Sequence, residues 1–544
     1  MAQLLQYNCF AKFNEGAPTH RHSKDRETPL PVYIGLSVFS KTRKKNLVET
    51  LHANGLSIPY KRVLEISTEL GDAVVSKYIE EDVVCPPELR KGLFTTSAMD
   101  NIDHNPSATS STSAFHGTSI SLFQHPTQDN QGEDREPLQV KGTTAKTVPE
   151  LPDSYVNITP AHIANKIPPP SQETDLVLPD VELLNPQLSL EYEWLQKVST
   201  ITDANESVDI TWSSHHADKK RSPAFQTCIS SLMPLLRDQA HSVATVKHVM
   251  DKIKEAVNIL NPGQVPVITA DQPIYALAKQ IQWKWPDQYG EEHFVIMFGG
   301  LHIEMTALRS LGCILKDSGW TGALTEAGVA SSGTADSFLS ASSVTKTRQA
   351  HQVTSCSLYK LLKAAYAAYV EDLDDPSEAM SLDDWIEDRK QRSPQFQYWY
   401  LVLTMELSIL LFIRSIREAN FNLYRQALCQ LMPFMFANNN VNYARWLPIH
   451  LKDMLTLEEQ HPQIAEAFHA GKFVINKTGR TFSGMAIDQA HEQANAIIKG
   501  DGGAIGITED PSALRRWMVA GPLVSHVVAN YEKVTGYQSL KRHL

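Results

Sequence analysis

The sequence lacks cysteines close enough together to act as a pair. Its six cysteines are widely spaced, so none fits the pattern that holds a zinc ion or frames a small disulfide scaffold. They are Cys9, Cys85, Cys228, Cys313, Cys356 and Cys429. This spacing excludes zinc fingers and small disulfide-stapled domains, and it favours a reducing compartment.

The chain also lacks an apolar run of membrane length. Its most apolar stretch, from Tyr398 to Ile413, is shorter than a bilayer span and contains Glu406, whose charge would be costly in lipid. We therefore expect a buried core helix there and no membrane partner. The first residues show no basic flank, apolar stretch and small-residue cleavage site of a secretory signal. These features predict an intracellular protein.

Positive charge is scarce in this sequence. With 50 Lys and Arg against 61 Asp and Glu, the chain of 544 residues has a formal net charge of -11. A protein coated with phosphate-binding side chains is excluded, because nonspecific DNA affinity comes mainly from Lys and Arg. Hydrophobic residues make up 42% and charged residues 20%, which is typical of a folded globular protein, here long enough for two or three domains. Any contact with DNA must use local basic patches.

One basic patch lies near the start of the chain. It consists of Lys41, Arg43, Lys44 and Lys45. Apolar residues between positions 40 and 70 flank an Ala-Asn-Gly turn, which predicts two short helices joined by a glycine-containing turn. A DNA-binding helix-turn-helix is one interpretation. Plain packing of two amphipathic helices with basic outer faces is the alternative and the more common outcome.

Strands and helices alternate in the middle of the chain. Residues 265–271 form a short apolar strand that ends in Asp271, and a helix is expected at 274–283. A second buried strand at 294–298 leads through two glycines into a further helix near His302. Strand, helix, strand, helix indicates an α/β layer with parallel strands.

The other regions differ in composition. Residues 127–186 are rich in Pro, Thr, Asn and Asp, which predicts an insertion or linker that is mobile in part. A helical pattern runs from 234 to 260, and long apolar patterns at 355–460 predict an all-helical insertion. A strand is expected at 472–476 and a helix at 488–498.

These patterns divide the chain into six expected regions. They are a helical N-terminal region at 1–91, the first core strands at 92–126, a Pro-rich linker at 127–200, the continued core at 201–350, the helical insertion at 351–470, and the C-terminal part of the core with a tail at 471–544. The core is therefore expected to be interrupted twice along the sequence.

Two aspartates end β-prone runs and are candidates for metal chemistry. Phosphodiester cleavage with divalent metals needs several carboxylates at one point, because hard cations prefer oxygen ligands. Asp271 lies at the carboxyl end of a buried strand, where open α/β sheets place their ligands, although it could instead cap the following helix. Asp100 ends the run from Leu93, and its alternative role is a turn with Asn101. Residues 115–124 could return antiparallel beside that run.

Five short strings occur in an order that resembles a known family. They are Met99-Asp100-Asn101, Thr269-Ala270-Asp271-Gln272, Phe298-Gly299-Gly300-Leu301-His302, Val441-Asn442-Tyr443-Ala444-Arg445-Trp446 and Ile487-Asp488-Gln489-Ala490-His491-Glu492-Gln493-Ala494-Asn495. They are similar to motifs of a transposon-associated family of domains of unknown function, related to RNase-H-like DDE-type transposases. The resemblance covers most of the chain from Gly92 onward. It implies an α/β fold with an RNase-H-like mixed sheet, interrupted by a large all-helical insertion and preceded by a small helical N-terminal region.

The resemblance also implies a catalytic site. Carried over residue by residue, it assigns the three catalytic, metal-binding acids to Asp100, Asp271 and Glu492, with Asn495 one turn beyond. His302 matches the histidine of a Cys-x-x-His motif whose cysteine is absent here, so we expect it to support a metal ligand. The implied cofactor is Mg²⁺ or Mn²⁺, and the implied partner is double-stranded DNA in the nucleus. A homo-oligomer is an option.

The third acid has two candidates. Glu492 lies on a helix that follows a loop, as the resemblance requires. Glu406 lies on the apolar helix and would be costly to bury unless it binds a metal or is paired. A salt bridge to Arg414 or Arg417 is the simpler explanation for Glu406. Glu492 is therefore the preferred third acid.

Two classes of function follow from these observations. The first is a transposon-derived protein that cleaves and transfers DNA strands with two metal ions, its present-day activity being unproven. The second is a non-catalytic DNA- or protein-binding module that keeps the fold, favoured by the negative net charge. Arg515 and Arg516 could add a DNA-facing surface, although a solvated helix edge is commoner. A mobile-element fragment without a host function fits the same sequence.

Overall fold

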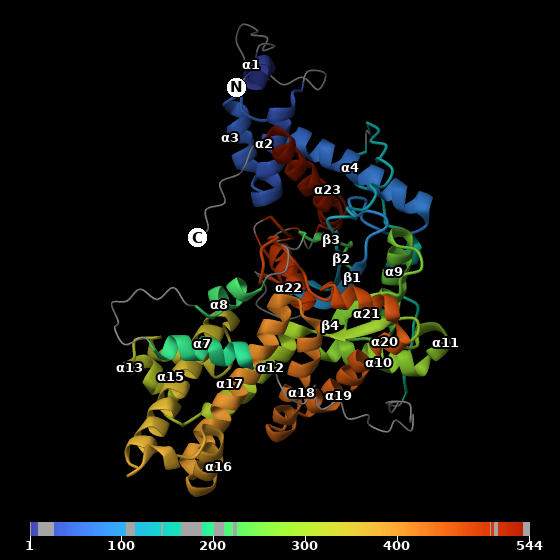
Figure 1. The fold of residues 1–544 in the computed structure, drawn as a ribbon. Helices are drawn as coiled ribbons and strands as arrows, with labels where there is room; N and C mark the ends of the chain where they lie inside the picture. Colours follow the sequence, from blue (N-terminus) through green and yellow to red (C-terminus); the bar gives the residue numbers. More distant parts are fainter. Residues whose placement is uncertain are drawn as a thin grey trace. The chain divides into compact units, whose positions relative to one another are not determined.

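The computed structural model describes residues 2–8, 27–104, 115–142, 145–164, 188–200, 211–220, 226–500, 502–504, 507 and 510–536. These residues form a mixed α/β protein with one small sheet and many helices (Figure 1). They divide into two compact units. Unit 1 contains the described parts of Met1–Ile167, Cys228–Ile296 and Ala490–Leu544, and unit 2 contains those of Pro168–Thr227 and Met297–Gln489.

A five-stranded mixed sheet organises unit 1, although Met297 and Phe298 at the end of its fifth strand belong to unit 2. Its strands are β1 (Thr95–His104), β2 (Phe115–Gln124), β3 (Ile229–Leu232), β4 (Val267–Ala270) and β5 (Val295–Phe298), in the spatial order β3-β2-β1-β4-β5. β2 pairs antiparallel with both β1 and β3, whereas β4 pairs parallel with β1. Because β1 and β4 run in the same direction, their carboxyl ends meet at the same edge of the sheet.

The burial of each strand explains its sequence. Every residue of β4 and β5 is buried, and a strand covered on both faces is apolar throughout. These two strands confirm the predictions at 265–271 and 294–298. β3 lies at an edge of the sheet and has only four residues, two of them serines. Its sequence carries too weak an apolar signal to predict a strand.

Unit 1 also contains helices. They are α1 (Ala2–Asn8), α2 (Pro29–Thr42), α3 (Lys45–Ala53), α4 (Tyr60–Glu81), α5 (Asp153–Val156), α9 (Val243–Leu260), α10 (Gln272–Lys284), α11 (Pro286–Tyr289), most of α22 (Ile487–Ile498) and α23 (Pro511–Thr535). Of these, α9 packs against β1 and α10 against β4. The helical pattern from 234 begins later than expected, because the Ser242 side chain caps α9 by accepting the Thr245 N–H.

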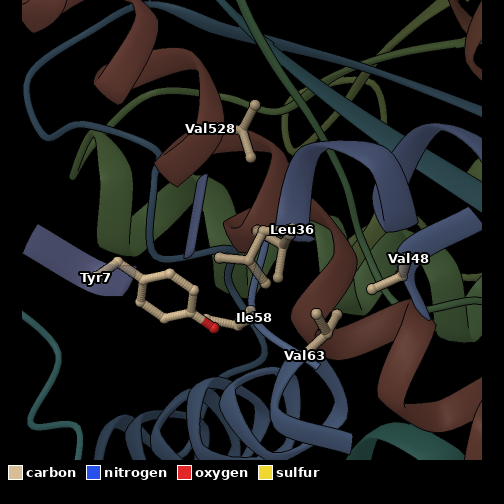
Figure 2. Close-up of a cluster of buried hydrophobic side chains, with 7 residues drawn as sticks. Tyr7, Leu36, Val48, Ile58, Val63 and Val528 are labelled. Atoms are coloured by element: carbon tan, nitrogen blue, oxygen red, sulfur yellow. The ribbon is translucent and has the colours of Figure 1, made fainter. Parts of the chain in front are cut away.

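The N-terminal helices share a small core of their own. Figure 2 shows Tyr7, Leu36, Val48, Ile58, Val63 and Val528 gathered there. Val528 belongs to α23, so the last helix completes a core that the first helices begin. The predicted glycine turn between α3 and α4 is confirmed, with Gly55 at a φ of +73°. The second helix is not short as predicted, because α4 continues for 22 residues.

The described part of the expected linker is packed against unit 1. Val148, Leu151 and Tyr155 are buried, and the Tyr155 hydroxyl donates to the Pro234 carbonyl. A Cβ on Gly71 of α4 would come within 2.6 Å of the Val148 side chain, so glycine permits this close approach. Residues 165–187 of the expected linker lie outside the described residues. Where the stretch from 127 to 164 is described, it is therefore part of the folded unit.

Unit 2 is helical in its described part. Its helices are α7 (Ser189–Ser199), α8 (Trp212–Lys219), α12 (Gly300–Leu315), α13 (Trp320–Glu326), α14 (Ser332–Phe338), α15 (Val344–Glu371), the 3₁₀ helix η3 (Pro376–Glu378), α16 (Leu382–Arg392), α17 (Pro394–Glu418), α18 (Phe421–Ala437), α19 (Val441–Leu455), α20 (Leu457–Gln460), α21 (Pro462–His469) and the start of α22. The all-helical character predicted for 355–460 is confirmed. α7 falls inside the range expected to be a linker, 127–200.

Two further expectations concern single segments of unit 2. α17 is long and apolar enough to cross a membrane by length and composition alone, but most of its apolar residues are buried inside the protein. This burial agrees with the predicted core helix. The strand predicted at 472–476 is wrong, because these residues contribute only an isolated bridge between Ile475 and Met485.

Candidate functional site

Asp100 and Asp271 are brought together by the pairing of β1 with β4. Met99 and Ala270 are register partners in this parallel pair, and each is followed directly by one of the two aspartates. Neighbouring strands lie about 4.8 Å apart, and side chains at matching positions share a face of the sheet. The two carboxylates are therefore neighbours. Asp271 directly follows β4, as predicted, but the strand end and the turn predicted at Asp100 are wrong, because β1 continues past Asp100 to His104 and stays paired with β2.

Asp271 also caps a helix. Its Oδ1 accepts the backbone N–H of Ile274 at 3.2 Å, and Pro273 occupies the first turn of α10, where a missing N–H costs nothing. The cap predicted as the alternative role of Asp271 is therefore confirmed. One carboxylate oxygen is committed to the cap and the group still lies beside Asp100.

The part of α22 in unit 1 packs on the sheet face that carries Asp100. Buried His491 places Nε2 3.0 Å from Ser119 Oγ and Nδ1 2.7 Å from Ser121 Oγ, both in β2. One turn later, Asn495 Nδ2 donates to Asp100 Oδ2 at 3.4 Å. Ser119 is the register partner of Asp100, so both anchors fall on the same patch of the sheet.

Apolar packing continues this contact along α22. Ile498 shares a buried cluster with Ile102 of β1 and with Leu514 and Met518 of α23. Ile102 comes two residues after Asp100 in β1, so its side chain lies on the same face of the sheet. The helix is therefore fixed by polar contacts near Glu492 and by hydrophobic burial beyond it. This arrangement holds Glu492 next to the two aspartates.

The hydrogen bonds around His491 have one consistent direction. Ser119 Oγ donates to the Asp100 carbonyl oxygen at 3.4 Å, so it accepts from His491 Nε2. Nδ1 then accepts from the Ser121 hydroxyl. Both ring nitrogens of His491 are therefore engaged with hydroxyl groups of β2. The imidazole acts here as a bridge between α22 and β2.

The three acids repel one another electrostatically. The pKa of Asp100 rises from its ordinary value of 3.8 to about 8, chiefly because of burial, and then because of the negative charges of Asp271 and Glu492. A hydrogen bond with Glu492 raises the pKa further, whereas the N–H of Asn101 lowers it. The site therefore stores unfavourable negative charge that a cation or a proton would relieve.

The donor set matches the chemistry of a divalent cation. Carboxylate and amide oxygens are the ligands that Mg²⁺ and Mn²⁺ prefer. The Asn495 Oδ1 is buried and accepts no hydrogen bond from the described residues. As the side chains stand, no cluster of three or more His, Cys, Asp or Glu in the described part of the chain is already arranged to hold a metal ion. The oxygen donors of these residues fit the chemistry of such a cation.

Glu406, the other candidate for the third acid, lies in unit 2 and has a different partner. It is fully buried in α17 and its Oε1 lies 2.9 Å from His351 Nδ1 of α15. Burial raises the pKa of Glu406, and His351 opposes this effect. The predicted salt bridge to Arg414 or Arg417 is wrong, because Arg414 pairs with Glu191 and Glu418 instead.

His302, expected to support a metal ligand, pairs with an acid of unit 2. Its Nδ1 lies 3.0 Å from Asp488 Oδ2. Asp488 also accepts the backbone N–H groups of Leu301 and His302, at 3.1 and 3.2 Å. A carboxylate at this position satisfies donors at the start of α12 and complements the helix dipole. Asp488, which lies beside the His302 ring, therefore caps the start of α12.

The basic patch near the N-terminus is only partly turned outward. Lys44 and Lys45 are exposed, and Lys41 is exposed but lies 3.7 Å from Glu532. Arg43 donates to the Gly503 carbonyl, and burial lowers its pKa. The exposed lysines are the members of this patch that are available for an anionic partner.

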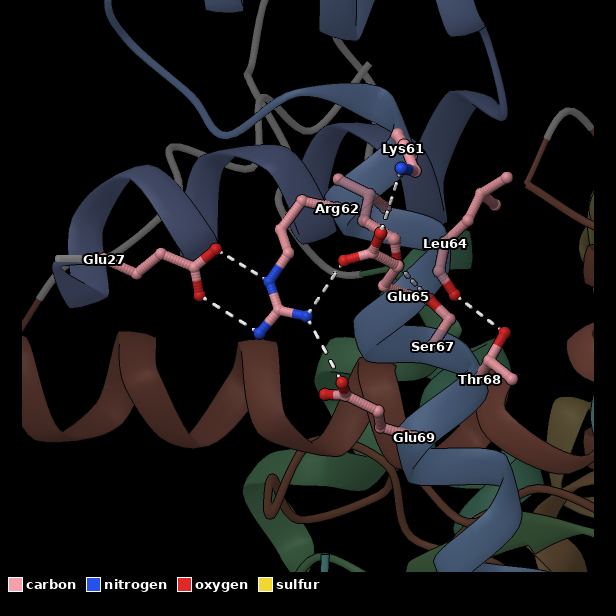
Figure 3. Close-up of polar contacts among 9 residues, drawn as sticks. Glu27, Lys61, Arg62, Leu64, Glu65, Ser67, Thr68 and Glu69 are labelled. Carbon is pink, nitrogen blue, oxygen red and sulfur yellow. Dashed lines mark hydrogen bonds and ion pairs between the residues drawn. The ribbon is translucent and has the colours of Figure 1, made fainter. Parts of the chain in front are cut away.

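Arg62, the basic residue at the start of α4, faces inward. Figure 3 shows its guanidinium group between Glu27, Glu65 and Glu69. The closest contact is 2.7 Å, from Arg62 Nε to Glu27 Oε1. Buried arginine with several carboxylate partners serves structure. The neighbouring Lys61 is exposed and lies 3.7 Å from Glu65.

Arg515 and Arg516 of α23 are engaged within unit 1. Arg515 donates to the Val148 carbonyl and pairs with Glu150. Arg516 donates to Thr68 Oγ1 at 3.0 Å and to the Lys146 carbonyl at 2.7 Å. Both guanidinium groups therefore tie α23 to the segment around Val148. The DNA contact predicted for them would have to compete with these bonds.

Sequence reasoning missed the polar anchors of α22. In the sequence, His491 belongs to one of the five short strings, but nothing in the string indicates what it contacts. Ser119 and Ser121 stand out only as polar residues in a β-prone run. The signal that could have found them is the spacing of serines two apart, which places both on one face of a strand. Such small residues leave room for a helix to approach the sheet closely.

Comparison with known proteins gives one family match. The family described as "Domain of unknown function (DUF8702)" matches residues 211–388 and 377–543. The matched residues include Asp271 and Glu492, whereas Asp100 precedes them. No curated protein and no solved structure matches the chain.

Proposed function

The chain belongs to the family of the domain of unknown function DUF8702, and because this description names no activity, we propose from the acid cluster that unit 1 is the core of an RNase-H-like DDE-type DNA transposase. Its proposed chemistry is metal-dependent cleavage and transfer of DNA strands. The proposal includes origin from a transposon, a nuclear location and double-stranded DNA as the partner.

One observation carries this proposal. Asp100, Asp271 and Glu492 reach one another from two adjacent parallel strands and one helix, closely enough for the two other acids to raise the pKa of Asp100. Most separate carboxylates on a protein surface avoid such an arrangement, because it costs free energy. Groups of acids with strongly perturbed pKa values are concentrated at functional sites.

The strand order supports the RNase-H-like part of the proposal. Three antiparallel strands lie in the order β3-β2-β1, and β4 then adds to β1 in parallel. In the family that the sequence resembles, the first acid lies on the first strand and the second follows the fourth. Asp100 and Asp271 occupy these two positions here. The helical unit 2 separates them along the chain from Glu492, as the resemblance implies.

Each residue of the site has a proposed role. Asp100, Asp271 and Glu492 would hold Mg²⁺ or Mn²⁺, with the Asn495 amide orienting Asp100. When bound, the cations would supply Lewis acidity for an attacking hydroxyl and a leaving oxygen. His491 keeps α22 on the sheet, and thereby keeps Glu492 within reach of the aspartates. The exposed Lys41, Lys44 and Lys45 would contact phosphates.

A nicking assay tests this function. The full chain is incubated with supercoiled double-stranded DNA and Mg²⁺ or Mn²⁺, and we expect nicked product that Asp271→Asn abolishes. Glu406→Gln is the matched control, since it changes a buried carboxylate of unit 2, and it should keep the activity. Equal nicking by wild type and Asp271→Asn would show that the activity comes from elsewhere.

The second candidate is a non-catalytic module that binds DNA or protein. Two observations favour it: the net charge of -11, and the absence of a ready-made metal cluster among the described residues. Titration with Mn²⁺ separates the two candidates. A catalytic core should bind Mn²⁺ through Asp100 and Asp271, whereas a module that has lost turnover should bind partner without metal and be insensitive to Asp100→Asn.

A further inference from the structure

A thiol, an imidazole and a hydroxyl lie close together in unit 1, away from the acid cluster. His125 directly follows β2, and Cys228 directly precedes β3. Since Gln124 and Ile229 are register partners in this antiparallel pair, His125 and Cys228 occupy the next opposed position. Cys228 Sγ lies 3.6 Å from His125 Nδ1, and His125 Nε2 lies 3.0 Å from Thr96 Oγ1 of β1.

The imidazole of His125 is held in one orientation. It is buried, its backbone N–H donates to the Phe94 carbonyl at 3.0 Å, and its ring packs against the Phe94 ring with centroids 5.8 Å apart. With the proton on Nε2 donated to Thr96 Oγ1, Nδ1 can accept the proton of the Cys228 thiol. The Thr96 contact survives that transfer, because Nε2 keeps its proton. A thiolate facing an imidazolium is the reactive form of cysteine.

The remaining described cysteines have different surroundings. Burial raises the pKa of Cys85 to about 12 and that of Cys356 to about 12. It also raises the pKa of Cys429. These three thiols are therefore poor nucleophiles. Cys313 is exposed, and no histidine contacts its thiol within the described residues, so it is an internal reference for an ordinary accessible thiol.

We propose that Cys228 is a reactive thiol that small hydroperoxides oxidise, with His125 as its base and Thr96 as the group that orients His125. The thiolate sulfur attacks one peroxide oxygen, forming an S–O bond as the O–O bond breaks. The departing oxygen takes the proton from His125 Nδ1 and leaves as water or an alcohol. Sulfur loses the two electrons that the peroxide gains, and Cys228 becomes a sulfenic acid. Cys228 is only partly buried, which gives a small oxidant access.

The test measures rates at individual cysteines in the reduced full chain. Hydrogen peroxide is added, sulfenic acid is trapped with dimedone, and labelled peptides are quantified by mass spectrometry. At pH 7 we expect Cys228 to be labelled about tenfold faster than Cys313, since the rate follows the thiolate fraction. His125→Gln should bring Cys228 down to the rate of Cys313 or below it. Thr96→Val, which keeps the side-chain shape, should lower the rate by a smaller factor.

A pH series in the wild-type chain keeps the test decisive if a variant does not fold. Below about pH 8 the labelling of an ordinary thiol falls roughly tenfold per pH unit, whereas a thiolate held by an imidazolium loses far less. The proposal is overturned if Cys228 reacts no faster than Cys313, if its rate falls as steeply with pH, or if folded His125→Gln reacts like the wild type. None of these readouts depends on nuclease activity.

Discussion

Ala270 of β4 is the register partner of Met99 of β1, and an aspartate follows each of them. This pairing alone fixes the distance between Asp100 and Asp271, because both side chains leave the sheet at matching positions. The third acid has no such constraint from the sheet. Its position depends on how α22 is anchored, and this difference between the acids leads to separate predictions.

Asp271 allows its two roles to be separated by substitution. Asp271→Ala removes both the helix cap and the charge, so we expect α10 to lose about 1 kcal/mol of stabilisation together with metal affinity. Asp271→Asn keeps a good cap but removes the charge, so stability should stay near that of the wild type while Mn²⁺ affinity falls. Urea unfolding and Mn²⁺ titration measure the two effects. If Asp271→Asn keeps both the stability and the Mn²⁺ affinity of the wild type, the Asp271 side chain serves only as a helix cap.

The raised pKa of Asp100 predicts how stability depends on pH. Since its pKa in the folded chain is about 8, against 3.8 ordinarily, the folded state binds the proton more tightly. Its contribution to stability is therefore complete below about pH 4 and is lost as pH rises toward 8. Between these limits the free energy of unfolding should fall by up to about 1.4 kcal/mol per pH unit.

The measurement is urea unfolding in EDTA across that pH range. Asp100→Asn removes the titrating group and should flatten the curve, leaving the variant more stable than the wild type at pH 8. Added Mn²⁺ should stabilise the wild type at pH 8 and have little effect on the variant. A wild-type curve that stays parallel to that of Asp100→Asn would contradict the close approach of the acids.

His491 is predicted to position Glu492 through its two serine contacts. His491→Ala removes the ring partner of both Ser119 and Ser121, and only the Ser119 hydroxyl keeps another bond, to the Asp100 carbonyl oxygen. We expect a loss of about 1–3 kcal/mol and weaker Mn²⁺ binding. The side chain in His491→Gln offers a donor and an acceptor, so this variant should recover part of the lost stability and part of the lost Mn²⁺ affinity. Unfolding curves and Mn²⁺ affinities give the two readouts. Metal affinity that is the same in all three proteins would limit His491 to a structural role.

The Glu406–His351 pair is predicted to be structural. His351→Ala leaves the buried Glu406 carboxylate without its partner, and such losses cost about 3–5 kcal/mol. Glu406→Gln removes the charge and should cost less. Thermal unfolding ranks the variants, with the double variant as the control for coupling. Loss of Mn²⁺ binding in folded Glu406→Gln would reverse the assignment of the third acid.

The segment from β4 to α12 could be predicted closely from the sequence. Its strands are continuous apolar runs, and Asp271, Pro273 and the glycines before His302 mark the helix starts locally. β3 could not be predicted, because four residues at a sheet edge carry little apolar pattern. Its place is set by pairing with β2, more than 100 residues earlier.

The site shows the same division between local and long-range information. Asp271 follows from a strand end, which is a local signal, whereas Asp100 lies inside β1, whose full length depends on pairing with β2. The partner of Glu406 could not be predicted, because His351 comes from another helix 55 residues away. The same holds for Ser119 and Ser121, which meet His491 about 370 residues later in the chain. Such contacts depend on how elements pack, which no local pattern encodes.

The discontinuity of unit 1 has a consequence for folding. Glu492 follows Asp271 by 221 residues (492 − 271), and the chain between them forms most of unit 2. Bringing Glu492 back to Asp271 closes a long loop, which costs conformational entropy. This cost is smaller when the chain between them has already folded into a compact helical unit. A growing chain contains β1 and β2 long before it contains α22, which packs on them. The acid cluster is therefore completed last, and a chain that stops short of residue 490 carries the two aspartates without the third acid.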